Sequence, residues 1–158
     1  MAPPDGDRAA AERVRELLET VVAGLRLDAE VEVVERAGDI DAALVGEDLA
    51  LAIGRHGQTI DAIQHLAYKV AVAGGVGKQR VTVDAGGYRE RRRVILERQA
   101  DEAAAMAEDS GNPVALEPMG ASERKVVHEY LKARGGVDTY SEGTEPKRHL
   151  VVAPLRFT

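Results

Sequence analysis

One tetrapeptide combines cationic side chains with glycines at a spacing that suits contact with phosphate. Gly54-Arg55-His56-Gly57 is followed at once by Gln58. Glycine lacks a Cβ, so a bulky polyanion can approach the backbone closely, and the exposed N–H groups of a helix start attract anions. Arg55 offers charge-assisted donors, and His56 can gain a proton in mildly acidic conditions. These residues predict a loop that grips a nucleic-acid backbone, or alternatively a tight turn that needs glycine only for its dihedrals.

A second cationic group lies in the C-terminal half. Arg124 and His128 are four residues apart in a segment that reads as a helix, so both side chains share one face. Together they could grip one phosphate or stack on a base. Neighbouring basic residues are expected to widen this surface, namely Lys125, Lys132, Arg134, Lys147 and Arg148. In the alternative, Arg124 pairs with Glu123 or Asp109 and His128 packs against Leu131.

Periodicity along the chain predicts the elements that must position these groups. Apolar residues at helical spacing and Gly or Pro stops predict helices over about residues 8–26, 49–53, 58–73, 88–109 and 122–134. Alternating patterns predict strands over about residues 30–33, 40–44, 80–85, 114–117, 137–141 and 149–153. Asp48 and Ser122 are expected to cap helices, and Gly74-Gly75 is expected to end one.

The order helix, strand, strand, short helix, Gly-x-x-Gly, helix, strand resembles the type II KH fold of bacterial proteins. The Gly-x-x-Gly loop falls where that fold has it, and Ile53 before the first glycine also fits. The resemblance implies that about four unpaired nucleotides run past the loop, with the N-terminus of the next helix at Gln58 and Thr59 binding phosphate. Bases would lie on an aliphatic floor near Leu51, Ile53 and Ile60, and no aromatic residue near the loop is expected to stack on them.

The remainder resembles an R-three-H domain, which is named for an Arg and a His four positions apart on a helix. Arg124 and His128 have this spacing, and the segment Ser141 to Arg148 followed by an apolar strand is also typical. The whole chain is similar to the Jag (SpoIIIJ-associated) family, also called KhpB. The segment Gly87 to Arg92 resembles that family's inter-domain signature. The cationic run Tyr88 to Arg93 would be either a solvated helix face or a phosphate contact. The separate N-terminal Jag domain of many members is not expected in this chain.

These resemblances imply an α+β protein of two domains. We expect a disordered N-terminus at residues 1–7, a KH-like domain at 8–87, and a small R-three-H α+β domain at 88–158 that includes a long connecting helix. Composition sets further limits. The chain has no cysteine, so disulfides and zinc–thiolate sites are excluded, and its histidines lack metal-ligand spacing. We expect no cofactor, no metal and no catalysis.

Charge is distributed unevenly along the chain. The net charge is −6, but residues 1–48 hold 13 acidic and 5 basic residues, while residues 49–158 hold 14 acidic and 16 basic residues. Local field matters more than total charge when a protein attracts a polyanion. The acidic excess therefore does not exclude nucleic-acid binding at the loop, although it could also serve solubility alone.

The function expected from these features is binding of single-stranded RNA by a cytoplasmic protein without membrane insertion. The resemblance implies a post-transcriptional regulator linked to cell elongation or division, and a small stand-alone KH protein, KhpA-like, as a partner. An adaptor in envelope biogenesis with little direct RNA binding is the alternative. Replacing Gly54 and Gly57 by Asp is expected to weaken RNA binding and to leave the fold intact.

Overall fold

The computed structural model describes residues 5–73, 75 and 78–156, and the chain forms two compact units, Met1–Arg89 and Glu90–Thr158. Each unit has its own sheet and its own aliphatic core. Both helices and strands occur in each unit, so the expected α+β class is confirmed. Within the described residues, no helix combines the length and the apolar character that crossing a membrane would require.

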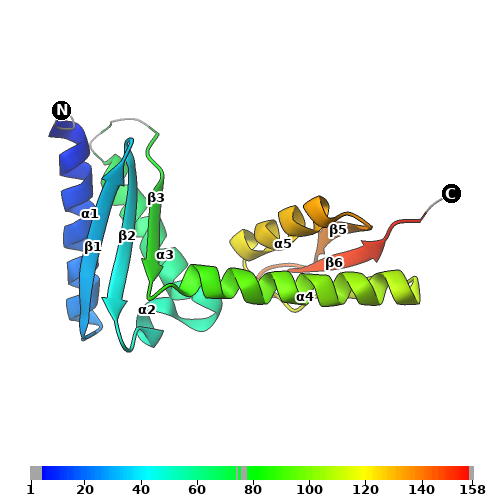
Figure 1. Ribbon diagram of the computed structural model, residues 1–158. Coiled ribbons are helices and arrows are strands. Elements are labelled where there is room, and N and C mark those ends of the chain that lie inside the picture. Colours follow the sequence, from blue (N-terminus) through cyan, green and yellow to red (C-terminus); the bar gives the residue numbers. More distant parts are fainter. Residues whose placement is uncertain (1–4, 74, 76–77, 157–158) are drawn as a thin grey trace. The chain divides into compact units, whose positions relative to one another are not determined.

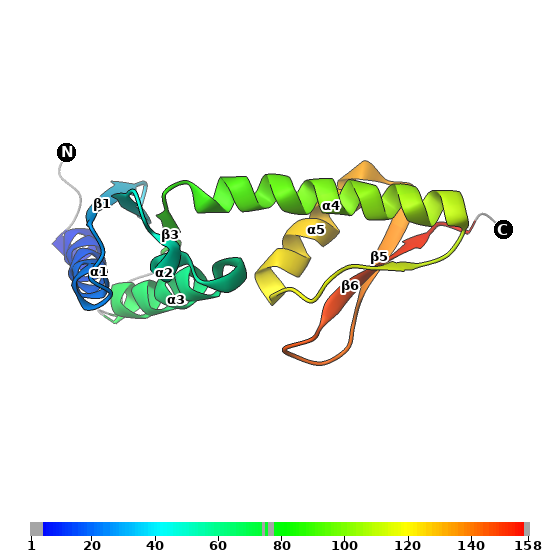
Figure 2. The ribbon, with the colours of Figure 1, turned by 90° about the horizontal axis from the view of Figure 1, so that it is seen from below.

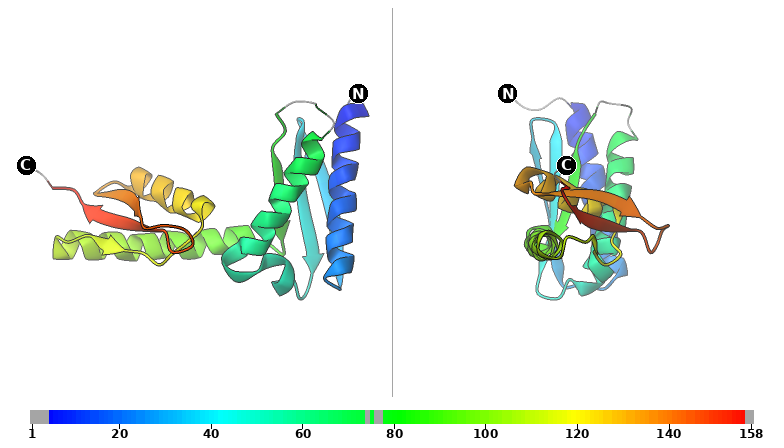
Figure 3. Two further views of the ribbon diagram at one scale, coloured as in Figure 1. Left: turned by 180° about the vertical axis from the view of Figure 1, so that it is seen from behind. Right: turned by 90° about the vertical axis from the view of Figure 1, so that its right-hand side faces the viewer.

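The first unit packs two helices on one face of a three-stranded sheet. Strands β1 and β2 are antiparallel, and β3 is parallel to β2 at the other edge. Helices α1 and α3 cover one face of this sheet, and among the described residues no element of the unit covers its other face (Figures 1 and 3). In chain order the elements are α1 (Asp5–Gly24), β1 (Ala29–Arg36), β2 (Asp39–Gly46), α2 (Ala50–Ile53), the 3-10 turn η1 (Arg55–Gly57), α3 (Gln58–Val72) and β3 (Val81–Ala85).

Alternation along the strands determines which side chains enter this core. On β2, Ile40, Ala42 and Leu44 are buried, whereas Asp41 and Val45 are exposed. Burial of such aliphatic side chains contributes about 1.5–3 kcal/mol for each large residue. The helix that follows the loop contributes the wholly buried Ile60, so the position of the loop is fixed directly by the core.

The second unit combines two helices with an antiparallel sheet whose strand order is β4-β6-β5. Its core joins alanines of α4 to Val127 and Leu131 of α5 and to Leu150 and Val152 of β6. The hairpin of β5 and β6 runs alongside α5 (Figure 2). The elements are α4 (Tyr88–Ser110), β4 (Val114–Ala115), α5 (Ala121–Arg134), β5 (Val137–Glu142) and β6 (His149–Pro154).

A few boundaries differ from those expected. Helix α1 begins at Asp5, inside the segment 1–7 that was expected to be disordered, and residues 1–4 lie outside the described residues. Ser122 is not the cap residue of α5, because that position is Gly120 and Ser122 lies inside the helix. The expected stop at Gly74 also lies outside the described residues, beyond the end of α3 at Val72.

Candidate nucleic-acid interface

The Gly-x-x-Gly loop connects α2 to α3 through three residues with positive φ. Gly54 has φ 71° and ψ −179°, a combination that only glycine adopts without strain. His56 has φ 53° and Gly57 has φ 76°, both in the left-handed region. His is among the side chains that tolerate this region, together with Asn and Asp. The loop thus turns sharply and places Gln58 at the start of α3.

Both glycines are also required by close neighbours. A Cβ on Gly54 would lie 2.1 Å from the Thr59 hydroxyl oxygen, and a Cβ on Gly57 would lie 2.7 Å from a ring carbon of Tyr88. Contacts this short force the backbone or the neighbour to move. The expectation that Gly54 and Gly57 can be replaced by Asp with the fold intact is therefore wrong.

The side chains between the glycines point to solvent. Arg55, His56 and Gln58 are exposed, and within the part of the chain that the structure describes neither Arg55 nor His56 makes an ion pair or a side-chain hydrogen bond. Two side chains that can carry positive charge thus stand where the dipole of α3 is positive. The structure brings the predicted loop residues together, and their contact with phosphate stays a prediction.

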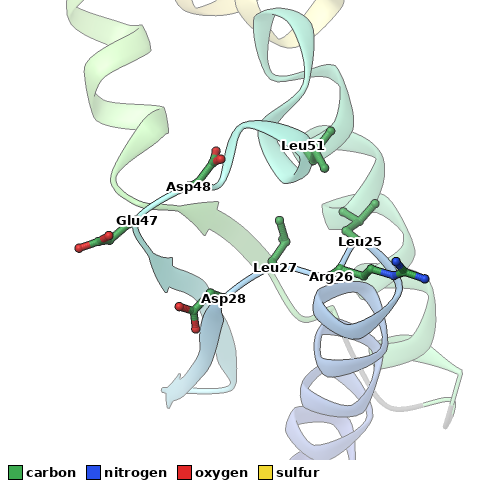
Figure 4. Close-up of a pocket in the computed structure, with 7 residues that line it drawn as sticks. All are labelled: Leu25, Arg26, Leu27, Asp28, Glu47, Asp48 and Leu51. Carbon is green, nitrogen blue, oxygen red and sulfur yellow. The ribbon is translucent and has the colours of Figure 1, made fainter.

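Only part of the expected aliphatic floor for bases lies at the surface. Ile60 is 0% exposed, and Ile53 is half-buried and packs against the core. Leu51 is 64% exposed, but it lines a hollow of about 350 Å³ between the α1–β1 and β2–α2 connections, together with three carboxylates (Figure 4). These belong to Asp28, Glu47 and Asp48. Arg26 also lines the hollow, but the carboxylates outnumber it, and their net negative charge disfavours a phosphate there.

Tyr88 was missed as a neighbour of the loop. It is 31 positions after Gly57, yet its half-buried ring packs on Gly57 and against the core of the first unit. An aromatic ring therefore lies beside the loop, and the expectation that bases do not stack on an aromatic residue there stays a prediction. Only the position of Tyr88 in a predicted inter-domain signature, directly after two glycines, could have drawn attention to it.

Arg89 attaches the start of α4 to the same region. Its guanidinium donates to the Asp61 carboxylate at 2.9 Å, to the Gln64 side-chain oxygen at 2.9 Å and to the Val83 carbonyl at 2.8 Å. Gln64 also accepts from the Val83 N–H at 2.9 Å. Side chains of α3 and α4 thus satisfy the backbone of β3 at Val83, so a base cannot read these groups without displacing them.

The arginine run beyond Arg89 is also bonded to carboxylates. Arg92 holds Glu123 through two hydrogen bonds of 2.6 and 3.1 Å, and Arg93 bonds to Glu90 and Glu97. Arg93 also holds the pKa of the Glu90 carboxyl below its usual value, chiefly through its hydrogen bond. The Arg92 contact indicates a structural role, whereas the exposed pairs of Arg93 on its own helix fit the solvated face expected from sequence.

Arg124 and His128 share one surface, as the helical spacing predicted. Both line an open hollow of about 430 Å³ between α5 and the β5–β6 hairpin. His128 is exposed, and its Nδ1 pairs with the Thr139 hydroxyl of β5. Lys125 and Arg148 line the same hollow, as does Tyr140, which is 48% exposed. The hollow therefore offers a ligand three arginine or lysine side chains, a titratable imidazole and one aromatic face.

The alternative partners considered for this pair are wrong. Glu123 bonds to Arg92, and Arg124 instead donates to the Met119 carbonyl at 2.7 Å and to the Glu145 carboxylate at 2.8 Å. His128 faces solvent and does not pack in the core beside Leu131. Helical spacing could not indicate Glu145, which lies 21 positions away on the hairpin loop.

Three further basic residues were expected to widen this surface, and the lining of the hollow includes none of them: Lys132, Arg134 and Lys147. Lys147 is exposed on the hairpin loop beside Arg148, although it does not line the hollow. Arg134 is not part of this surface, because it bonds to Glu108 and pairs with Asp101 of α4. Its hydrogen bond holds the pKa of the Glu108 carboxyl below the usual value.

Comparison with known proteins matches both units. Residues 11–84 match the family described as KhpA/KhpB, KH domain, and residues 91–154 match the R-three-H domain family. The RNA-binding protein KhpB of Bacillus subtilis is 34% identical over 142 residues, which cover 88% of this chain and 68% of that protein. KhpB of Clostridium symbiosum is 35% identical over 143 residues, covering 89% of this chain and 64% of the relative.

A shorter match is found to RNA-binding protein KhpB of Lactiplantibacillus plantarum, which is 42% identical over 103 residues, or 65% of this chain and 32% of that protein. The chain thus spans between about a third and two thirds of the length of these curated relatives.

Proposed function

The chain belongs to the KhpB family, and from this membership we propose that it binds single-stranded RNA at two cationic surfaces without catalysing a reaction. The first surface is the loop Gly54–Gly57, and the second is the hollow lined by Arg124, Lys125, His128 and Arg148. The names of the relatives and the presence of a KH and an R-three-H domain support RNA as the ligand.

The observation that carries the proposal is the exposure of Arg55 and His56 between two sterically required glycines. A turn that served only to connect two helices would not need an exposed arginine and an exposed histidine at the positive end of α3. Contacts to phosphate supply most of the affinity of sequence-tolerant binding, and that affinity falls as salt rises. We therefore expect modest sequence preference and strong salt dependence.

The loop is tested by replacing Arg55 and His56 together by Asp. Both side chains are exposed, and Asp tolerates the left-handed conformation of residue 56, so the fold is kept. We expect affinity for a fluorescent single-stranded RNA to fall about tenfold or more, because two phosphate contacts become repulsive. The matched control replaces Arg55 by Gln and His56 by Asn and should lose less. Equal affinity of all three proteins across a salt titration would remove the loop from the site.

The role of RNA binding in the cell is part of the same proposal. We infer a cytoplasmic post-transcriptional regulator linked to cell elongation or division, with a small stand-alone KH protein of the KhpA type as a partner. Sequencing of RNA crosslinked in cells to the unchanged protein and to the Arg55→Asp, His56→Asp variant tests this role. Transcripts of elongation and division genes should be depleted in the variant, and an unchanged set of transcripts would contradict it.

An adaptor function is the second candidate, and the open face of the first sheet favours it. Glu30, Glu32 and Asp41 are exposed there, in cross-strand register with Val45, Ala43 and Val34, and the two valines are 44% and 45% exposed. This mixed acidic and apolar face suits a basic protein partner. If the adaptor function dominates, a protein partner co-purifies with the unchanged chain even after nuclease treatment, and Glu30→Lys with Glu32→Lys abolishes this co-purification. RNA crosslinking to the unchanged protein then stays at background.

A further inference from the structure

Glu145 is a carboxylate placed beside a surface that is otherwise cationic. Its Oε1 accepts a 2.8 Å hydrogen bond from one terminal nitrogen of Arg124, and its side chain is 59% exposed. A negative charge at this place repels phosphate, so by charge alone it weakens the proposed RNA contact. If Glu145 supports RNA binding, its contact with Arg124 must therefore contribute more to affinity than this repulsion removes.

The geometry around Arg124 indicates the form of this contribution. The other terminal nitrogen of Arg124 donates to the Met119 carbonyl at 2.7 Å, and the Arg124 side chain is only 11% exposed. The two anchors come from different segments, since Met119 precedes α5 and Glu145 belongs to the β5–β6 loop. Glu145 does not line the hollow, whereas Arg124 does. The carboxylate thus holds the guanidinium from the side and leaves the hollow open.

The same loop is joined to the rest of the hollow by further bonds. The Met119 N–H donates to the Arg148 carbonyl at 3.2 Å, and the Arg148 guanidinium donates to the Gly143 carbonyl at 2.8 Å. Both arginines of the hollow are therefore fixed before any ligand arrives. A ligand that meets fixed groups loses less side-chain entropy on binding, so the orientation of these groups adds to affinity.

We propose that Glu145 is a positioning residue, which acts through Arg124 by holding its guanidinium in a fixed orientation at the wall of the hollow. The inference rests on the proposed function, because the ligand of the hollow is taken to be an RNA phosphate. It makes a prediction that charge alone does not: removing this negative charge weakens the binding of a polyanion.

The experiment measures the affinity of the full chain for a fluorescent single-stranded RNA at fixed salt. Glu145→Ala is expected to lower affinity about threefold or more, which corresponds to the lower end of the net contribution of one hydrogen bond. Glu145→Gln keeps an acceptor and should recover part of the loss. The matched control is Glu142→Ala at the end of β5, because Glu142 pairs with His149 and does not line the hollow, so removal of its negative charge should leave affinity unchanged or slightly raised. In an Arg124→Ala background, Glu145→Ala should cause no further loss.

A second measurement does not depend on RNA. In the unchanged protein, NMR of nitrogen-labelled arginine should show separate signals for the two terminal nitrogens of Arg124, because both are held. These signals should merge in Glu145→Ala, while circular dichroism shows an unchanged fold.

Three outcomes overturn the inference. Affinity that is unchanged or raised in Glu145→Ala would show that the carboxylate is neutral toward the ligand or competes with it, and the proposed function would stand. Separate Arg124 signals in Glu145→Ala would show that the carboxylate is not what holds the guanidinium. Failure of the unchanged protein to bind any single-stranded RNA would overturn the proposed function, and the inference with it.

Discussion

Gly57 shows at the scale of one residue how the loop depends on a distant side chain. Its φ of 76° is left-handed, and its missing Cβ leaves room for the Tyr88 ring. Gly57→Ala should lower the free energy of unfolding of the first unit by about 1–2 kcal/mol for the dihedral and by about 1–3 kcal/mol more for the overlap. Denaturant unfolding followed by amide NMR signals of that unit measures the change.

Gly38 provides the matched control for Gly57. It has φ 85° in the turn between β1 and β2, and nothing lies within 4 Å of the position that an added methyl group would take. Gly38→Ala should therefore show the dihedral cost alone. The difference between the two substitutions should shrink in a Tyr88→Leu background. An equal loss of stability for Gly57→Ala and Gly38→Ala would mean that the Tyr88 ring moves aside without a cost in free energy.

Lys125 tests phosphate contact in the second unit without disturbing a packed group. Its side chain is 75% exposed and lines the hollow. Lys125→Gln should reduce the slope of log affinity against log salt by about 0.7, the value for one lost phosphate contact on a single strand. Lys132→Gln on the same helix is the control, because Lys132 does not line the hollow. Equal slopes for the two variants would place the RNA elsewhere.

At the scale of elements, Arg92 and Glu123 connect α4 to α5 inside the second unit. Their side chains are 19% and 10% exposed, and the two hydrogen bonds between them are short. Glu123→Ala leaves a largely buried guanidinium without this partner. We expect a loss of about 3 kcal/mol, near the lower limit for breaking a buried pair.

The exposed pair of Arg98 and Glu102 on α4 gives the comparison for that loss. Their side chains are 72% and 66% exposed, and their closest charged atoms are 3.8 Å apart. Glu102→Ala should change the stability by about 0.5 kcal/mol or less. Urea unfolding followed by amide signals of the second unit measures both variants. Similar losses at Glu102 and Glu123 would contradict the importance of the buried pair.

Tyr130 and Asp101 form a second α5–α4 contact, which depends on pH. The Tyr130 hydroxyl donates to the Asp101 carboxylate at 2.7 Å, and this hydrogen bond raises the pKa of Tyr130 above its usual value. Because the folded pKa is raised, the stabilisation is present below the unfolded pKa of about 10 and is lost as pH rises through the folded value. Ultraviolet titration should show one tyrosine that ionises late, and Asp101→Asn should bring it back toward the others.

The elements themselves could be predicted from the sequence, because each leaves a local pattern. Alternation at Val31 and Val33 predicted β1, and Ile60, Ile63 and Ala67 predicted the buried face of α3. Contacts between elements leave no such pattern. The ring of Tyr88 on Gly57 and the carboxylate of Glu145 on Arg124 join segments whose separation carries no period, so only the folded chain reveals them.

The candidate RNA-binding residues could also be predicted where they follow a local pattern. Helical spacing places Arg124 and His128 on one face, and they line one hollow. The aliphatic floor could be predicted only in part, because hydrophobicity alone does not distinguish a core residue from a surface one. Ile60 is in the core, and Leu51 is beside carboxylates.

At the scale of the whole molecule, the acidic excess and the cationic surfaces occupy separate places. Exposed carboxylates lie on the open face of the first sheet and around the hollow beside Leu51. The loop residues Arg55 and His56 and the hollow of the second unit carry the positive groups. A net charge of −6 is therefore compatible with RNA binding, because a polyanion responds to the local field.

Two cationic surfaces on one chain predict a dependence of affinity on RNA length. An oligonucleotide that reaches only one surface binds with the affinity of that surface. A longer RNA that reaches both makes the second contact intramolecular, and the resulting gain can reach about 10²–10⁴. Affinity measured against single strands of increasing length should therefore rise in a step. This step should exceed the gradual increase that comes from the larger number of binding positions on a longer RNA.

The variants of the two surfaces identify the origin of this step. On long RNA, Arg55→Asp with His56→Asp, or Lys125→Gln with Arg148→Gln, should each abolish the step while the remaining surface still binds. On short RNA, each pair should remove one of two independent binding events and leave the other unchanged. A gradual rise with length in the unchanged protein would show that a single surface binds the RNA, and a step that survives in both variants would show that the step does not arise from these two surfaces.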